Sequence, residues 1–394
     1  MGTGRVTLFF IITAAALLFA CPLCPAEPEM LITDIQKINA VDIDQYVQRD
    51  SGSFGSAVCS IGDLNGDGIT DMAVGSPADN EGEGRYRGAV WILFMNPDKT
   101  VLKKQKINYL HGGFTGRLYD YDFFGAAVSA LNDLDGDGVT DMAVGSIRDS
   151  DAGDRHGAVW ILFMNPDGTV KNQTKINELY GGFTGKLADG AWFGCSLASI
   201  GDLDGDGNSE LAVGAAKDET GLLTGTLWIL FLKQDGTVKY SSKIDGQTKM
   251  LKNEIKDWDE FGSAVAPTGD FDRDGIPDIA VGALGDNNGQ GSVYILMLTP
   301  EGTVKSYHKI SSEQGTLEGQ LNDNDLFGHS IAAIGDMDDN GTVDLAVGAP
   351  NDDDGGANRG AVWLLFMDSE GTATSHLKIS HSRPEIESCF TNGD

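Results

Sequence analysis

An internal repeat is the feature that most constrains how this chain can fold. Five segments align with one another without gaps: FGSAVCSIGDLNGDG (54–68), FGAAVSALNDLDGDG (124–138), FGCSLASIGDLDGDG (193–207), FGSAVAPTGDFDRDG (261–275) and FGHSIAAIGDMDDNG (327–341). Their starts lie 70, 69, 68 and 66 residues apart. A repeat this regular predicts one supersecondary unit that is stacked on copies of itself.

Each unit contains four segments that have the pattern of β-strands. The Phe-Gly segment is followed by an apolar run such as ITDMAVGSP (69–77), a polar loop, a second run such as GAVWILFM (88–95), a turn such as NPDGT (165–169), and a segment that ends in KIN, KID or KIS. The run WILFM does not alternate between polar and apolar residues, so both of its faces are expected to be buried. The 53 glycines among 394 residues indicate many tight turns.

These units predict an all-β fold, a β-propeller of four-stranded blades. Stacking small sheets around an axis buries both faces of the apolar strands and leaves few open strand edges. The blades are expected to start near residues 54, 124, 193, 261 and 327. A linear stack of the same sheets is the alternative.

The two ends of the repeat region bear on how the ring closes. Residues 31–39, LITDIQKIN, match the fourth strand of a unit, and residues 387–394 stand where other units have the sequence before Phe-Gly. We therefore expect five complete blades plus one N-terminal outer strand. On this interpretation the chain is a truncated part of a six- or seven-bladed ring.

The apolar run TLFFIITAAALLFA (7–20) is predicted to be the core of a signal peptide. It is too short to cross a bilayer comfortably. The predicted division is a signal peptide over 1–26 and a propeller over 27–394, with lipid attachment at Cys21 as the alternative. No second membrane segment is predicted, so the mature chain is expected to be secreted or held at the cell surface. Of the other cysteines, Cys24 lies in this leader, and Cys59, Cys195 and Cys389 are expected to be buried single thiols.

Every unit also carries the pattern Asp-x-(Asp/Asn)-x-(Asp/Asn)-Gly-x-x-(Asp/Glu), which predicts a cation-binding loop. Acids at alternate positions one, three and five can point inward, position seven offers a backbone carbonyl, and position nine completes the shell. The predicted ligands are Asp63, Asn65, Asp67, Ile69 and Asp71; Asp133, Asp135, Asp137, Val139 and Asp141; Asp202, Asp204, Asp206, Asn208 and Glu210; Asp270, Asp272, Asp274, Ile276 and Asp278; and Asp336, Asp338, Asn340, Thr342 and Asp344.

Calcium is the cation that fits this pattern, with up to five ions per chain. Ca²⁺ takes six to eight oxygen ligands, whereas Mg²⁺ prefers a smaller octahedral shell that keeps its waters. An EF-hand is excluded because position twelve is valine in all five loops instead of glutamate. Glu210 and Asn340 depart from aspartate, and their loops are expected to bind more weakly.

The combination of Phe-Gly, the acidic loop, and Val-Gly-Ser-Pro (74–77) or Val-Gly-Ala-Pro (347–350) resembles the FG-GAP repeats of the integrin α-subunit N-terminal propeller. The resemblance covers about residues 31–394. Ile147, Ala216 and Leu284 depart from it, because they stand at the proline position. The resemblance implies that calcium is mainly structural and sits in loops on the lower face.

The resemblance also implies that ligands and partner subunits meet the opposite, upper face. That face would be formed by the loops between strands two and three and by the connections between blades. The candidate residues are 78–88 (with Arg85, Tyr86 and Arg87), 147–157 (with Arg155 and His156), 216–225, 284–291 and 350–360, with Tyr119, Tyr121, Trp192 and Trp258 in the connections. The tryptophans that recur in strand three (Trp91, Trp160, Trp228 and Trp363) are expected to be core.

A formal charge of −31 excludes non-specific binding to nucleic acid or to anionic membranes. The chain has no P-loop, nucleophile elbow or HExxH motif, so it is not expected to be an enzyme. We expect an adhesion or protein-recognition module that binds a protein or glycan ligand. A calcium-rigidified spacer in a larger surface protein, or a propeller-borne hydrolase or lyase, is the alternative.

Overall fold

The structure is a computed structural model that describes residues 10–15, 31–38, 52–82, 84–218, 223–314, 317, 320–354, 356–380 and 382. Within these ranges, regular structure is almost entirely β-strand. The exception is the four-residue segment α2 (Asp286–Gly289). Cys21, Cys24, Cys389 and the predicted cleavage site after residue 26 lie outside the described residues.

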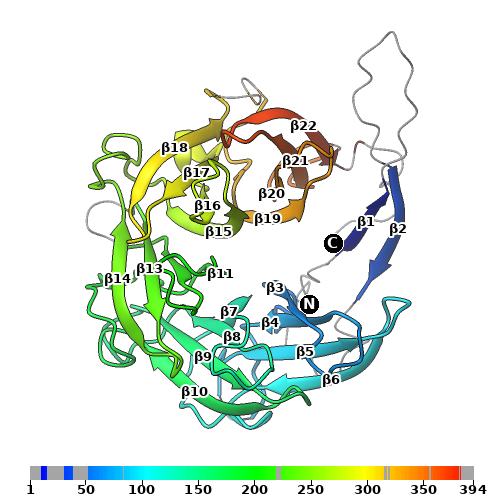
Figure 1. Ribbon diagram of the computed structural model, residues 1–394, viewed down its shortest axis with the longest axis vertical. Coiled ribbons are helices and arrows are strands. Elements are labelled where there is room, and N and C mark those ends of the chain that lie inside the picture. The colour runs from blue at the N-terminus through cyan, green and yellow to red at the C-terminus, as the bar shows by residue number, and fades with distance from the viewer. Residues whose placement is uncertain are drawn as a thin grey trace.

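Five antiparallel sheets, each of four strands that follow one another along the chain, are arranged around a common centre (Figure 1). The first strand of each sheet lies nearest the centre and the fourth lies outermost. The sheets are β3 (Val58–Gly62), β4 (Asp71–Ser76), β5 (Ala89–Met95) and β6 (Val101–Ile107); β7 (Phe124–Ala130), β8 (Met142–Ser146), β9 (Ala158–Met164) and β10 (Val170–Ile176); β11 (Leu197–Ser199), β12 (Leu211–Ala215), β13 (Thr226–Leu232) and β14 (Val238–Ile244); β15 (Phe261–Gly269), β16 (Asp278–Ala283), β17 (Ser292–Leu298) and β18 (Val304–Ser311); and β19 (Ser330–Gly335), β20 (Asp344–Ala349), β21 (Ala361–Met367) and β22 (Ala373–Ser380). This confirms the predicted β-propeller over the linear stack.

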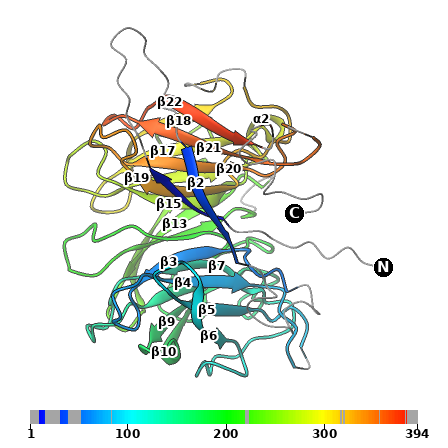
Figure 2. The ribbon, with the colours of Figure 1, turned by 90° about the vertical axis from the view of Figure 1, so that its right-hand side faces the viewer.

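A sixth, two-stranded sheet lies in the gap of the ring between the first and fifth blades (Figures 1 and 2). It pairs β1 (Phe10–Ala15) with β2 (Leu31–Lys37) in an antiparallel register. Strand β2 covers most of the segment predicted to be an outer strand. Its partner β1 falls within the run predicted to be a signal-peptide core.

The third strand of each blade is the centre of the core. All seven residues of β5, β9, β13 and β17 are buried, as their unbroken apolar pattern predicted. The strand-three tryptophans are buried as well, with exposed fractions of 3%, 5%, 6% and 1% for Trp91, Trp160, Trp228 and Trp363. Burial of each large apolar side chain contributes about 1.5–3 kcal/mol to folding.

The Val-Gly pair of one blade contacts the Phe-Gly pair of the next blade at the interface between their sheets. The Gly75 backbone lies so close to its neighbour that a Cβ there would stand 2.0 Å from the carbonyl oxygen of Gly125. The same contact recurs between Gly145 and Gly194, also at 2.0 Å. Phe124 beside it is fully buried between the sheets. These motifs are therefore sites of close backbone packing between blades, where any larger side chain would clash.

Candidate metal centres

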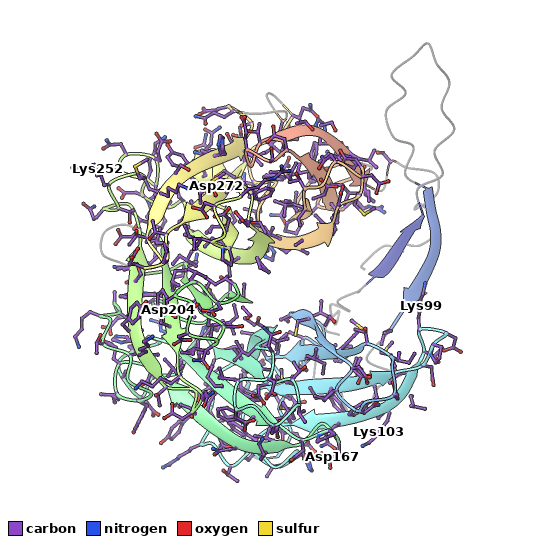
Figure 3. All side chains as sticks on the ribbon, in the orientation of Figure 1. Lys99, Lys103, Asp167, Asp204, Lys252 and Asp272 are labelled. Carbon is purple, nitrogen blue, oxygen red and sulfur yellow. The ribbon has the colours of Figure 1, made fainter. Side chains whose placement is uncertain are left out.

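The predicted cation loops connect the first and second strands of each blade. Because the four strands run antiparallel in sequence order, these loops lie at one end of every sheet, which we call the loop end. The loops between strands two and three lie at the opposite end. Figure 3 places Asp204 and Asp272, from the third and fourth loops, on neighbouring blades.

The backbone of each loop wraps around the first aspartate. In the first loop, the amides of Gly66 and Asp67 donate to Asp63 Oδ1 over 2.8 and 2.9 Å, and that of Gly68 donates to Oδ2 over 2.7 Å. The second loop repeats the arrangement around Asp133 with the same distances. Three backbone donors set the orientation of the carboxylate in these two loops.

The ninth residue joins the loop to the sheet. Asp71 is fully buried, and its two oxygens accept from the amides of Leu64 (3.1 Å) and Met95 (3.0 Å). Met95 ends the third strand, so this carboxylate connects the loop to the middle of the blade. The same pair of bonds recurs at Asp141, Asp278 and Asp344.

Glu210 breaks this pattern. One of its oxygens accepts from the amide of Leu203 over 2.5 Å. The other, Oε1, is buried and has no hydrogen-bond partner among the described residues. The sequence predicted a weaker site here because glutamate is longer than aspartate. In the described part of the chain, one oxygen of Glu210 is thus left without a protein donor, and weaker binding at this loop stays a prediction.

In four loops, carboxylate oxygens converge to within 4.8 Å of one another, close enough to hold one metal ion. The groups are Asp202, Asp204, Asp206 and Glu210; Asp133, Asp135 and Asp141; Asp270, Asp272 and Asp278; and Asp336, Asp338 and Asp344. No such group forms among the described acids of the first loop, where Asn65 replaces one carboxylate. Asp137 and Asp274 stand outside their groups, and the predicted use of the position-seven carbonyls stays a prediction.

Burial makes these sites costly to ionise without a cation. It raises the pKa of Asp141 and of Asp278 to about 6, and neighbouring carboxylates push in the same direction. It raises the pKa of Glu210 to about 8, with a further rise from three aspartates of the same loop. A bound cation would offset both burial and repulsion.

The opposite end of each blade holds a second repeated cluster, which the sequence analysis missed. A buried aspartate follows strand two and pairs with a lysine near the end of strand four, and that lysine lies over the strand-three aromatic ring. In the second blade, Lys175 Nζ stands 2.6 Å from Asp151 Oδ2, contacts buried Asp149, and lies 5.2 Å from the centre of the Trp160 ring. The pairs are Asp79–Lys106, Asp149–Lys175, Asp218–Lys243, Asp286–Lys309 and Asp352–Lys378.

A sequence signal for this cluster exists. The aspartate always stands four residues after the glycine of the Val-Gly pair, and the lysine always precedes the isoleucine of the KIN, KID or KIS ending. Each residue recurs in register, but their pairing depends on the order of strands in the sheet. The acidic loops drew attention because their ligands are neighbours in sequence, whereas Asp79 and Lys106 are 27 residues apart.

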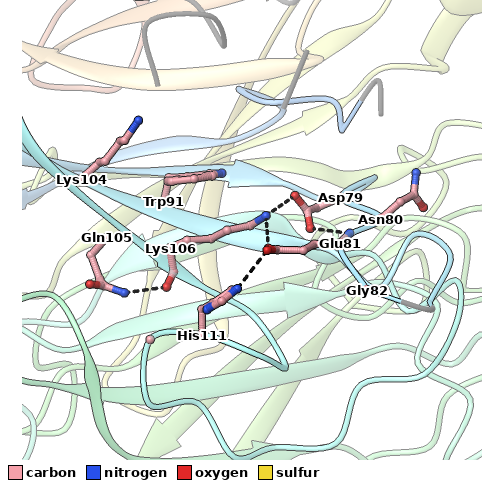
Figure 4. A pocket seen from close by; sticks show the side chains of 10 residues that line it. Asp79, Asn80, Glu81, Gly82, Trp91, Lys104, Gln105, Lys106 and His111 are labelled. Carbon is pink, nitrogen blue, oxygen red and sulfur yellow. Dashed lines mark hydrogen bonds and ion pairs between the residues drawn. The ribbon is translucent and has the colours of Figure 1, made fainter. Parts of the chain in front are cut away.

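In the first blade this cluster lines a cavity of about 690 Å³ (Figure 4). Glu81 bonds Lys106 Nζ over 2.7 Å through one oxygen and His111 Nε2 over 2.9 Å through the other. These contacts lower the pKa of Glu81, although its burial opposes them. Asp79, Glu81, Lys106 and His111 of the cavity are therefore joined to one another.

The candidate partner loops at this end form a connected surface. The loop before strand three of one blade accepts backbone bonds from the connection to the next blade, as in Tyr121 N to Arg85 O (2.7 Å) and Phe123 N to Tyr86 O (3.0 Å). Tyr119, Tyr121 and Trp258 are 39%, 42% and 57% exposed.

Two other candidate residues at this end are less accessible. Trp192 is half-buried beneath Arg148, whose guanidinium lies 5.3 Å from its ring. His156 is buried between Glu178 and Asp189 at 2.6 and 3.0 Å, so it does not present an open surface.

The two described cysteines, Cys59 and Cys195, are unpaired as predicted, but each residue is half-buried instead of fully buried. Burial raises their thiol pKa values to about 12 and about 11, which makes them poor nucleophiles.

The FG-GAP repeat family model matches this chain at residues 54–93, 261–296 and 327–365. Human integrin alpha-IIb is 32% identical over 217 residues, covering 51% of this chain and 19% of that protein. Chicken (Gallus gallus) integrin alpha-V is 32% identical over 241 residues, covering 59% and 20%. Xenopus laevis integrin alpha-4 is 32% identical over 190 residues, covering 47% and 17%. The matched regions span about a fifth of the length of these relatives.

Among solved structures, a chain from the crystal structure of BBS1N in complex with ARL6DN covers 81% of this chain and 68% of its own length, at 13% identity and a TM-score of 0.40. We draw no argument from that likeness. Within its described residues, this chain contains no helix that is both long and apolar enough to span a membrane.

Proposed function

We propose that this chain is a calcium-stabilised FG-GAP propeller that serves as a secreted or cell-surface module for adhesion or protein recognition. The single observation that carries the proposal is the repeated geometry of the loop end. There, backbone donors and alternate acids build the same oxygen-lined site in blade after blade, in a chain that is similar to integrin alpha subunits.

The donor set fits Ca²⁺. It consists of carboxylate oxygens, and two of them, Glu210 Oε1 and Asp135 Oδ1, are buried without a hydrogen-bond partner among the described residues. The ligands would be the acids and amides of positions one, three, five and nine, with the position-seven carbonyl as the remaining protein donor. When bound, calcium would supply positive charge that neutralises each loop.

Calcium in this arrangement is structural. The loops lie at the end of the sheets opposite to the strand-two-to-three loops, and their ninth residue connects to the end of the buried third strand. We therefore place the partner surface, for a protein or a glycan, at the opposite end. Exposed tyrosine and tryptophan side chains beside arginine are typical of binding hot spots.

A non-enzymatic role follows from the same proposal. In the cavity of the first blade, the groups that could act as acid, base or nucleophile include Glu81, Lys106 and His111. Glu81 is hydrogen-bonded to both of the others. Export remains part of the proposal, through a signal peptide over 1–26 or a lipid at Cys21.

The calcium proposal is tested by melting the protein with EDTA, with 5 mM CaCl₂ and with 5 mM MgCl₂, while metal content is measured by mass spectrometry. Calcium is expected to raise the melting temperature strongly and magnesium less. Equal melting temperatures with calcium and with EDTA would refute the assignment.

The recognition proposal is tested by screening the calcium-loaded protein against arrays of extracellular proteins and glycans. Tyr121→Ala and Trp258→Ala should abolish binding, and Leu102→Ala, an equally exposed apolar change on β6, should not. A folded protein that binds nothing in these arrays would favour the spacer alternative.

A further inference from the structure

A lysine of the fourth strand contacts three of the five cation loops from outside. It is the second residue of the strand in each case. Lys239 Nζ lies 2.8 and 3.0 Å from the Oδ2 atoms of Asp204 and Asp206. Lys305 lies 2.7 Å from both equivalent oxygens of Asp272 and Asp274. Lys171 bridges Asp135 (2.7 Å) and Asp137 in the same way.

The other two loops have no lysine at this place. The equivalent strand position is Leu102 in the first blade and Thr374 in the fifth. These are also the two loops in which an asparagine replaces an acid, Asn65 at position three and Asn340 at position five. The lysine is thus present where positions one, three, five and nine hold four acids and missing where they hold three.

The asparagines make different outer contacts in these two loops. Asn65 Nδ2 donates to Asp67 Oδ2 over 2.9 Å, the oxygen type that binds lysine in the other loops. Asn340 Nδ2 donates to the carbonyl of Met367 over 2.9 Å, so its outer atom is a neutral donor that requires no cation. The outer oxygen of position five is therefore bound by an amide in the first loop, and in the fifth loop this position carries no charge.

We propose that Lys171, Lys239 and Lys305 are positioning residues that hold the outer oxygens of positions three and five and compensate the fourth carboxylate of their loops. Counted over positions one, three, five and nine, four carboxylates with one lysine and three carboxylates alone both carry a formal charge of −3; Arg273 and Asp339, at position four of the fourth and fifth loops, lie outside this count. This inference rests on the proposed calcium function and adds that the sets of metal ligands are matched in charge.

The lysine leaves the inner side of the loop open to a cation. All of its contacts are to Oδ2 atoms. In the second loop, Asp135 Oδ1 is buried without a partner among the described residues, and Asp137 Oδ1 accepts from the amide of Val139. The lysine thus acts from outside the site, where its charge offsets that of the outer oxygens and opposes that of a bound cation.

The test follows each loop separately by hydrogen exchange and mass spectrometry on the full chain, with peptides that cover each loop and free Ca²⁺ as the variable. Lys171→Leu should make the second loop exchange faster in EDTA and lower its calcium midpoint roughly three- to tenfold, because a repelling charge is removed. Asp135→Asn should raise the midpoint by a similar factor. The double variant should return to within about twofold of the wild type.

Two further variants sharpen the test. Leu102→Lys adds a positive charge to a three-acid loop and should raise the midpoint of the first loop alone. Lys104→Leu removes an exposed lysine from the same strand, β6, and should leave that midpoint unchanged. The differences should shrink between 50 and 500 mM NaCl, since salt screens exposed charges.

The outcomes separate this inference from the function on which it rests. Calcium protection of all loops in the wild type, with a Lys171→Leu midpoint unchanged or raised, would overturn the lysine role and leave calcium binding intact. A double variant whose calcium midpoint stays more than about twofold away from that of the wild type would overturn it too. Absence of calcium protection in the wild type would instead refute the proposed function.

Discussion

The two ends of each blade differ in how their carboxylates are neutralised. At the loop end, acids converge on one another, and the lysines that touch them remain 32%, 41% and 46% exposed. At the opposite end, the aspartate that follows strand two of each blade has its own lysine, and Lys175 and Asp149 are only 9% and 1% exposed. Strand β10 supplies a lysine to each end: Lys171 at its start contacts the loop end, and Lys175 near its last residue contacts the opposite end.

The difference indicates where an external cation is required. At the opposite end, the aspartates after strand two are neutralised by lysine pairs that form as the strands align, while burial raises the pKa of Asp122 and of Asp259, in the connections between blades, to about 7 and about 6. The loop end retains uncompensated negative charge, and its buried position-nine carboxyls have raised pKa values. Calcium is therefore expected to stabilise one end of the propeller and to leave the other unaffected.

Among the changes that test this difference between the two ends, removal of calcium should alter the free energy of unfolding most. Each millimolar-affinity site adds about 1–3 kcal/mol when it is well saturated, so the loops together are expected to contribute on the order of 5 kcal/mol or more to the free energy of unfolding. Urea denaturation in calcium and in EDTA measures this contribution as the difference between the two free energies of unfolding. A difference below that of a single site would mean that the loop end needs no cation.

Lys175→Met should produce the next largest effect, at the opposite end. It leaves Asp149 buried without its partner, and loss of one member of a buried pair costs about 3–5 kcal/mol. The loss should be the same in calcium and in EDTA by urea denaturation. Lys104→Met, on the exposed side of β6, is the matched control; dependence of the Lys175 effect on calcium would show that the two ends are coupled.

The pH dependence of the metal-free protein should follow Glu210. Its pKa rises from 4.5 in the unfolded chain to about 8 in the folded one, so its stability contribution is complete below pH 4.5 and is lost as the pH rises to about 8. Melting temperatures in EDTA should fall across this window, less so in Glu210→Gln. In calcium the fall should shrink, with proton release on binding detectable by calorimetry in two buffers. A melting temperature in EDTA that does not change with pH across this window would contradict the role of Glu210.

Trp258→Ala should have the smallest effect on stability. Its side chain is 57% exposed at the opposite end, and surface substitutions usually change stability by within about 0.5 kcal/mol. Calcium midpoints should also stay unchanged. If this variant shifted the calcium response of the fourth loop, the surface proposed for a partner would not be independent of the loop end.

Much of this architecture was predictable from local sequence. Ungapped repeats such as 124–138 located the blades, the unbroken run of β9 identified a strand buried on both faces, and alternate acids such as Asp133 and Asp135 located the cation loops. These inferences succeed because the interacting groups are neighbours along the chain, where spacing alone determines which side chains converge.

The contacts between distant residues were decided by the tertiary structure. Nothing local joins Asp149 to Lys175, Lys171 to Asp137, or Gly75 to Gly125, because each pair meets only when antiparallel strands take their register and one blade passes the next. Glu210 illustrates the same limit: its added length suggested a poorer ligand, and only the folded loop shows that one oxygen is left unbound. Sequence determined which groups are present and how often they recur, and the packing of sheets determined which charges are already compensated.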